Sequence, residues 1–213
     1  MRPIIAAALI ALPVVSTVPT IAAAQATPVA GGFMMRPDDA KANTSAVKFV
    51  AMSKGWHATM GPVHAIFYRP AMTAKGTFTA TLDAYFFGPP GRFPEGYGII
   101  IGGKNLDAAN QSYLYFLARN DGKFLIKKRE GAQTPTIVDW TASPVIRTVK
   151  PGDSTDVENV FTVHATTDSV IFSINNTRVA ARPRAEIGAD GVVGFRINHG
   201  LSIHVASIKV EPK

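Results

Sequence analysis

The chain has 213 residues, a formal net charge of +7 at pH 7 and no cysteine. The lack of cysteine excludes disulfides, thiolate metal sites and lipid-anchored export, which needs a cysteine directly after the cleavage site. A chain of this length can bury one hydrophobic core without such cross-links. Its basic residues are scattered, and the densest cluster, Lys127-Lys128-Arg129, is followed at once by Glu130. We therefore expect a solvated strand face and no nucleic-acid partner.

Residues 1–26 have the features of a cleaved signal peptide. Arg2 precedes an apolar stretch from Ile4 to Val18, and Ala24-Gln25-Ala26 fits the small-x-small cleavage pattern. The apolar stretch is shorter than the roughly 20 residues that a membrane-spanning helix needs. Removing these 26 residues from 213 leaves 187, and the loss of Arg2 lowers the net charge to +6. We expect a periplasmic or secreted bacterial protein without a transmembrane segment in its mature chain.

Short apolar runs cut by turn residues follow one another from residue 47 to the end. Residues 27–46 are rich in Ala, Gly, Pro and Thr, and we expect a flexible leader there, followed by one domain over 47–213. In Gly96–Gly131, turns at Gly102-Gly103 and Asn120-Asp121-Gly122 separate three strand-like runs. Further strands are predicted over 56–60, 63–69, 76–87, 136–140, 145–149, 159–165, 169–175, 178–182, 192–198 and 201–210. About twelve short strands without a 3.6-residue period predict an all-β sandwich.

The sequence also predicts where the chain turns and which side chains of a strand face the core. Asn175-Asn176 indicates a tight hairpin, because Asn tolerates the left-handed conformation. Residues 76–87 alternate between apolar and polar side chains, which is typical of a half-buried strand. In the last strand, the alternation slips at Ala206-Ser207 and predicts a β-bulge.

Three segments near the end of the chain resemble a known superfamily. They read SVIFSINN from Ser169, DGVVGFRINH from Asp190 and LSIHVASIKV from Leu201. These segments are similar to the closing strands of the concanavalin A-like lectin/glucanase superfamily, including its laminin-G-like domains. They are also similar to the end of 3-keto-disaccharide hydrolase-type domains. Over Trp56–Val210, the resemblance implies a two-sheet antiparallel jelly-roll sandwich.

The resemblance extends to the scaffold but not to the usual active sites. The Glu-x-Asp-x-x-Glu strand of the retaining glucanases and the legume-type calcium and manganese loop are both missing. Glycoside hydrolysis usually needs two carboxyl groups that flank the scissile bond. An enzyme would have to use Glu95, in the Pro-rich loop before Tyr97, with Asp83 or a histidine as partner. The simpler interpretation of Glu95 is a solvated loop residue.

We expect no metal ion and no other cofactor. First and last strands are often neighbours in jelly rolls, so His57 and His64 can meet His199 and His204, but their spacing matches no zinc motif. Ordinary surface histidines are the simpler interpretation. A calcium site at Asp153, Asp156 and Glu158 is a weak alternative to a plain turn.

The best indication of binding is a run of side chains on one strand face. Tyr113, Tyr115, Leu117 and Arg119 share one parity. Aromatic rings pack against the C–H faces of sugars, and charged donors bind their hydroxyls or carboxylates. If Arg129 and Arg196 line the same sheet, anionic sugars such as uronic acids become candidate ligands. The alternative is that the tyrosines fill the sandwich core, where we also expect Trp140.

The sequence therefore predicts an exported, lectin-like module that binds a saccharide on its concave sheet and adjacent loops. One alternative is a glycosidase-like enzyme with Glu95 as general acid or base. The other is a structural or protein-interaction module. The predicted ligand-binding residues are Tyr85, Glu95, Tyr113, Arg119, Arg129, Arg196 and His199.

Overall fold

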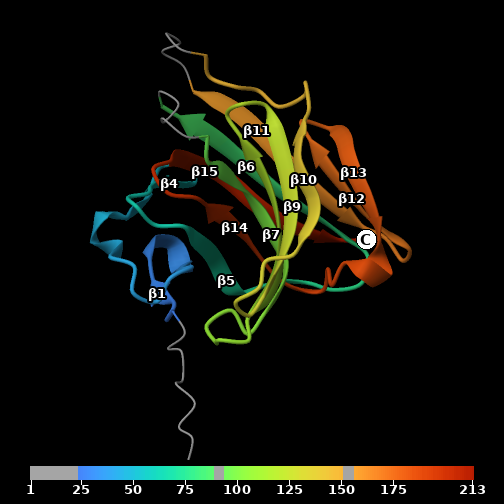
Figure 1. Cartoon of the computed structure of the whole chain (residues 1–213), viewed down its shortest axis with the longest axis horizontal. Helices are drawn as coiled ribbons and strands as arrows, with labels where there is room; N and C mark the ends of the chain where they lie inside the picture. The colour runs from blue at the N-terminus through green and yellow to red at the C-terminus, as the bar shows by residue number, and fades with distance from the viewer. Residues whose placement is uncertain (1–23, 89–93, 151–155) are drawn as a thin grey trace, which may run out of the picture.

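The computed structural model describes residues 24–88, 94–150 and 156–213. These residues form two antiparallel sheets that face each other as two layers (Figure 1). The eight-stranded sheet has, in spatial order, β1 (Thr27–Pro28), β2 (Met34–Pro37), β5 (Ala65–Ala74), β14 (Gly191–Ile197), β7 (Gly96–Lys104), β8 (Ser112–Arg119), β9 (Lys123–Glu130) and β10 (Thr136–Ala142). The seven-stranded sheet has β13 (Thr177–Pro183), β12 (Ser169–Ile174), β11 (Val157–Ala165), β6 (Phe78–Phe87), β15 (Ser202–Pro212), β4 (Trp56–Thr59) and β3 (Lys48–Ala51). This arrangement confirms the predicted all-β sandwich.

The main core lies between the two sheets. Along β6, buried residues alternate with partly exposed ones from Phe78 to Phe86, as the sequence pattern predicts. Phe116 of β8 meets Phe161 and Phe172 edge to face, with ring centroids 5.6 and 5.3 Å apart. These rings join the two sheets, and such edge-to-face contacts are favourable for aromatic pairs.

Two local predictions are confirmed, the β-bulge in the last strand and the tight hairpin at Asn175-Asn176. The pairing of β15 with β6 shifts register between Val205 and Ser207, where the slip in alternation predicts a bulge. Asn175 and Asn176 join β12 to β13 with positive φ angles of 50° and 65°. The last strand, β15, lies between β6 and β4, so early and late parts of the chain are neighbours.

The segment expected to be a flexible leader is part of the sandwich instead. It contains β1, β2 and the 3-10 turns Ala30–Gly32 and Thr44–Ala46. Phe33 is 1 % exposed and packs edge to face against Trp56 and Phe195. Gly31 has a φ of 69°, which forms the turn that leads into this buried ring. Gly31 therefore forms a defined turn and does not make the segment flexible. The eight-stranded sheet includes residues before position 47.

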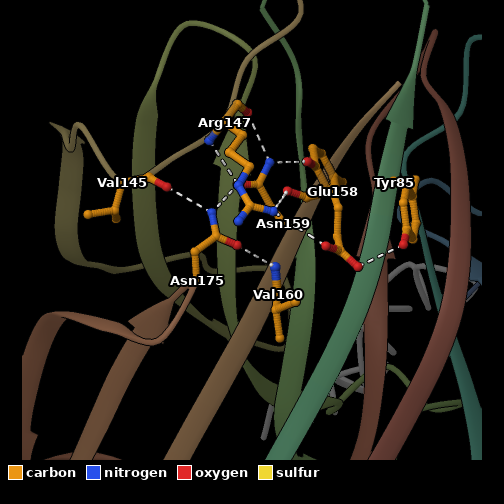
Figure 2. Close-up of polar contacts among 8 residues, drawn as sticks. Tyr85, Val145, Arg147, Glu158, Asn159, Val160 and Asn175 are labelled. Carbon is orange, nitrogen blue, oxygen red and sulfur yellow. Dashed lines mark hydrogen bonds and ion pairs between the residues drawn. The ribbon is translucent and has the colours of Figure 1, made fainter. Parts of the chain in front are cut away.

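The predicted strand over residues 145–149 does not form. This segment crosses one end of the sandwich, with Ile146 and Val149 buried in the main core. Figure 2 shows how two amide side chains hold it. Asn159 accepts from the Arg147 backbone N–H at 3.0 Å and donates to the Arg147 carbonyl at 2.9 Å, and Asn175 donates to the Val145 carbonyl at 2.7 Å. The apolar side chains of residues 145–149 are therefore explained by burial in the core and not by pairing in a sheet.

Residues 1–23 lie outside the described part of the chain, so the signal peptide stays a prediction. Of the residues described, none form a helix that is long and apolar enough to cross a membrane.

Candidate functional site

The middle strands of the eight-stranded sheet are buried on their outer face as well as on their core face. A second apolar cluster lies on this outer face, apart from the main core: Ile66, Tyr68, Ile100, Leu106, Tyr113, Tyr115, Leu117 and Leu125. Strands β7 and β8 are consequently buried on both sides along most of their length. This explains their nearly continuous apolar sequence, which is usual for strands covered on both faces.

Arginine side chains lie among these tyrosines. Arg196 of β14 donates to both carboxylate oxygens of Asp38, at 2.8 and 2.6 Å, and its NH1 is 3.4 Å from the Tyr113 hydroxyl. Its guanidinium carbon also lies 5.1 Å from the ring centroid of Tyr115. Such an arginine, stacked and bidentate, has a fixed orientation.

Two more arginines complete the group. Arg36 of β2 donates to the carbonyls of Ala24 and Ala108, at 2.9 and 3.2 Å. Arg129 of β9 lies opposite Tyr113 in the pairing of β8 with β9, and it donates to the Gly131 carbonyl at 2.6 Å. We call this group the arginine–tyrosine cluster: Arg36, Asp38, Tyr113, Tyr115, Arg129 and Arg196.

The arginine–tyrosine cluster carries excess positive charge. Burial alone would raise the pKa of Asp38, but the hydrogen bonds and charge of Arg196 outweigh it and hold that pKa below its ordinary value. Burial alone would lower the pKa of Arg196, but Asp38 raises it above its ordinary value. Burial raises the pKa of Tyr115 to about 12, so this hydroxyl stays neutral. The cluster therefore contains three guanidinium groups and one carboxylate, and only Arg196 pairs with that carboxylate.

The cluster has a buried base and an accessible rim. Tyr113 is 1 % exposed and Arg196 is 7 % exposed, so both lie beneath the surface. The rim includes Arg119, whose guanidinium carbon lies 4.2 Å from the ring centroid of Trp140 and whose Nε donates to Asp121 at 2.7 Å. Trp140 thus lies on the outer face, and the expectation that it is a core residue is wrong. The pairing of β10 with β9 shifts register between Val138 and Thr141, and at this irregularity the Trp140 ring lies on the outer face.

The predicted shared face of Tyr113, Tyr115, Leu117 and Arg119 is confirmed, and Arg196 lies on it too. The alternative, in which these tyrosines fill the space between the sheets, is wrong, because Tyr113 and Tyr115 belong to the outer cluster. The burial of Tyr113 nevertheless makes its ring unavailable for stacking on a sugar in this conformation.

Tyr85 belongs to the other sheet. Its hydroxyl donates to Glu158 at 2.7 Å, and Glu158 also pairs with Arg147 at 3.3 Å (Figure 2). Burial, followed by the charge of Glu158, raises the pKa of the neighbouring Asp83 to about 6. In the calcium hypothesis, Asp153 lies outside the described residues, and Glu158 already has these two partners.

The enzyme hypothesis pairs Glu95 with Asp83 or a histidine, and the structure separates Glu95 from Asp83. Asp83 points outward from the seven-stranded sheet, whereas Glu95 precedes β7 of the eight-stranded sheet. Packed sheets lie about 10 Å apart, so these carboxyl groups do not flank one bond.

Glu95 and His199 meet at one end of the eight-stranded sheet. Glu95 accepts from Asn198 at 3.0 Å, its Oε1 is 3.4 Å from His199 Nδ1, and His199 Nδ1 is 3.1 Å from His64 Nε2. The backbone N–H of Asp38 donates to the His64 carbonyl at 2.9 Å, so this end adjoins the arginine–tyrosine cluster.

Sequence reasoning missed Arg36 and Asp38 because they lie in the supposed leader. The signal that the sequence offers is the run FMMRPDD, in which the apolar residues Phe33, Met34 and Met35 directly precede Arg36.

Comparison with known proteins identifies the fold. No protein-family model and no curated protein matches the chain. Solved structures do match, among them the carbohydrate-binding module CBM66 from Bacillus subtilis, with a TM-score of 0.60 at 12 % identity over 83 % of this chain and 94 % of that one. The chain has the concanavalin A-like jelly-roll fold.

Two further structures agree with this assignment. A Bacillus subtilis protein of unknown function with a galectin-like fold has a TM-score of 0.57 at 14 % identity, covering 84 % of this chain and 88 % of that one. The carbohydrate recognition domain of Emp46p has a TM-score of 0.54 at 12 % identity, with the same coverage of 84 % and 88 %. At such identities the likeness establishes the fold alone, which is the jelly-roll sandwich that the sequence resemblance implies.

Proposed function

We propose that this protein is a carbohydrate-binding, lectin-like module that binds an anionic glycan on the outer face of its eight-stranded sheet. The observation that carries the proposal is the arginine–tyrosine cluster, which contains three guanidinium groups and two tyrosines but one carboxylate, that of Asp38, which pairs with Arg196. Its occurrence on a fold shared with CBM66 and the Emp46p carbohydrate recognition domain supports a saccharide as ligand.

The chemistry of the rim suits an acidic sugar. Arg129 and Arg119 offer N–H donors that match a carboxylate or sulfate group, and such charge-assisted hydrogen bonds are stronger than neutral ones. Trp140 offers an aromatic surface against which the C–H face of a sugar ring can pack. Beneath them, Asp38, Tyr113 and Arg196 act as positioning residues that fix the sheet surface.

Export fits the same proposal. Cleavage after Ala26 would remove Ala24, whose carbonyl accepts from Arg36 Nε at 2.9 Å. In the mature chain, Arg36 Nε would then be released from this carbonyl and could donate to a ligand. An exported module would meet glycans of the cell envelope or the surroundings.

The proposal is tested by a glycan array with the mature protein, with and without calcium, followed by calorimetry on the best acidic polysaccharide. We expect binding to acidic glycans that weakens as salt rises, since salt screens exposed charges. Arg129→Ala should weaken binding roughly 10-fold, the loss expected for one charged hydrogen-bond donor. Arg178→Ala is the matched control, because Arg178 is an exposed arginine on β13 of the other sheet.

Two results would contradict the proposal. One is a blank array under both conditions, which would favour the protein-interaction alternative. The other is equal binding by the Arg129→Ala and Arg178→Ala variants, which would place the ligand elsewhere. Incubating the best ligand with the protein and looking for cleavage products tests the glycosidase-like alternative directly.

A further inference from the structure

The end of the eight-stranded sheet brings together two imidazoles and a carboxylate from three separate segments. His64 precedes β5, Glu95 precedes β7, and His199 follows β14, which lies between β5 and β7 in the sheet. Ile197, near the end of β14, pairs with Ala65 on one side and Tyr97 on the other. The register of three adjacent strands therefore places these side chains at one point.

We propose that His64, Glu95 and His199 form a binding site for a divalent transition-metal ion, with zinc as the best match. Their ligand atoms all lie within 4.8 Å of one another. His199 Nδ1 is 3.1 Å from His64 Nε2 and 3.4 Å from Glu95 Oε1. Two zinc–ligand bonds of about 2.0–2.1 Å at the tetrahedral angle place their donor atoms about 3.3 Å apart, which matches both distances.

Hydrogen bonds among His64, Glu95 and His199 do not give each of the three atoms a partner of its own. His199 Nδ1 faces a carboxylate oxygen and a second imidazole nitrogen at the same time. If it carries a proton, that proton serves two acceptors, and if it does not, its lone pair faces the lone pair of Glu95 Oε1. A cation among the three atoms accepts a lone pair from each of them.

Asn198 orients the carboxylate of Glu95 by a hydrogen bond. Its Nδ2 donates to Glu95 Oε2 at 3.0 Å, which leaves Oε1 directed toward the histidines. Its Oδ1 is buried and has no hydrogen-bond partner among the described residues. Outer hydrogen bonds of this kind orient carboxylate ligands in metal sites.

The ligand set selects the type of metal and leaves it accessible. Imidazole and carboxylate together suit zinc and neighbouring transition metals, whereas calcium takes oxygen ligands only. The side chains of His199 and Glu95 are 41 % and 19 % exposed. A three-ligand site open to solvent keeps a fourth position for water or an incoming ligand.

The proposal is tested by calorimetric titration of zinc chloride into the untagged, chelator-treated protein at neutral pH. We expect one zinc ion per chain and no calcium binding. His199→Gln and Glu95→Gln should each weaken zinc binding at least 10-fold. His57→Gln and His204→Gln are matched controls. This second histidine pair has ring centroids 6.2 Å apart and belongs to no cluster of three ligand residues in the part of the chain that the structure describes, so both variants should leave zinc binding unchanged.

A second readout separates binding at this site from loss of folding. A zinc concentration 100-fold above the wild-type Kd should raise the Tm of the wild-type protein by roughly 5–10 °C, and the same concentration should raise the Tm of the His199→Gln variant by at most about half as much. Circular dichroism of each variant without metal verifies its fold. X-ray absorption of the bound zinc should report nitrogen and oxygen ligands. Absence of zinc binding by the wild type, or the same affinity in His199→Gln and His57→Gln, would overturn the proposal.

Discussion

Arg196 and Asp38 lie 158 residues apart in the chain and are joined by two hydrogen bonds of 2.8 and 2.6 Å. The pair connects β14, in the middle of the eight-stranded sheet, to the residue that follows β2 near its edge. Arg196 is nearly buried, so its charge depends on this one carboxylate. The pair also anchors the N-terminal segment to the face that we propose binds a glycan.

Removing the carboxylate should destabilise the fold. Asp38→Ala leaves the buried Arg196 charge uncompensated, and breaking a buried ion pair typically costs about 3–5 kcal/mol. The Asp38 side chain is 27 % exposed, so we expect the lower end of that range, about 3 kcal/mol of unfolding free energy. Urea denaturation measures this loss, and Asp39→Ala is the control because Asp39 is exposed and only caps a local turn.

The same pair predicts a pH dependence. The pKa of Asp38 is lower in the folded state than the pKa of about 3.9 expected in the unfolded chain. The ion pair therefore contributes fully to stability above the unfolded pKa, and this contribution is lost as the pH falls through the folded pKa. The wild type and Asp38→Asn should therefore differ in stability by a constant amount between pH 5 and 8 and converge below about pH 4. A difference that instead grows as the pH falls would contradict the assigned ion pair.

Asp83 should show the opposite behaviour. Burial and then Glu158 raise the pKa of Asp83 to about 6 in the folded state. In the unfolded chain its pKa is about 3.9, so between about pH 3.9 and 6 the folded state holds a proton that the unfolded state lacks. The unfolding free energy should decrease as the pH rises through that window. Asp83→Asn should flatten this dependence and be more stable than the wild type at pH 7–8, as measured by denaturation from pH 4 to 8. Asp168→Asn, at an exposed turn, should behave like the wild type.

Asn159 is the buried centre of the network in Figure 2. It is 0 % exposed and bonds Arg147, Tyr97 and Asn175. Asn159→Ala should lower the unfolding free energy by about 3 kcal/mol, since it leaves several buried polar groups unsatisfied. In a double-mutant cycle, Asn159→Ala and Asn175→Ala should be less than additive, because both remove the same contact. Strict additivity would show that the two amides act independently.

The sequence predicted local geometry better than long-range placement. Alternation along residues 78–86 and the slip at Ala206-Ser207 depend on neighbouring side chains only, and both are confirmed. Parity likewise placed Tyr113 and Arg119 on one face. It did not reveal that Tyr113 is buried, because the outer cluster around it includes residues far away in the chain, such as Ile66 and Tyr68.

The errors in the predicted site have a related cause. Parity assigns a side chain to one face of its own strand but does not identify the sheet, so Tyr85 was grouped with residues of the opposite sheet. Arg36 and Asp38 were missed because glycine and proline around them indicate loops, whereas the burial of Phe33 fixes this segment through tertiary contacts. The jelly-roll resemblance allowed for a meeting of early and late histidines, but the pairing of His64 with His199 beside Glu95 depends on strand order, which one sequence does not specify.

The two glycines of the N-terminal turn provide a direct test of that segment. Gly31 and Gly32 have similar positive φ angles of 69° and 72°, so alanine is similarly strained at both positions. A Cβ on Gly31 would lie 2.2 Å from Trp56 Nε1, whereas a Cβ on Gly32 has nothing within 4 Å. Gly31→Ala should therefore destabilise the protein by about 1–3 kcal/mol more than Gly32→Ala, the usual cost of overpacking. Thermal and urea unfolding measure the difference, and equal losses would mean that the turn does not pack on Trp56.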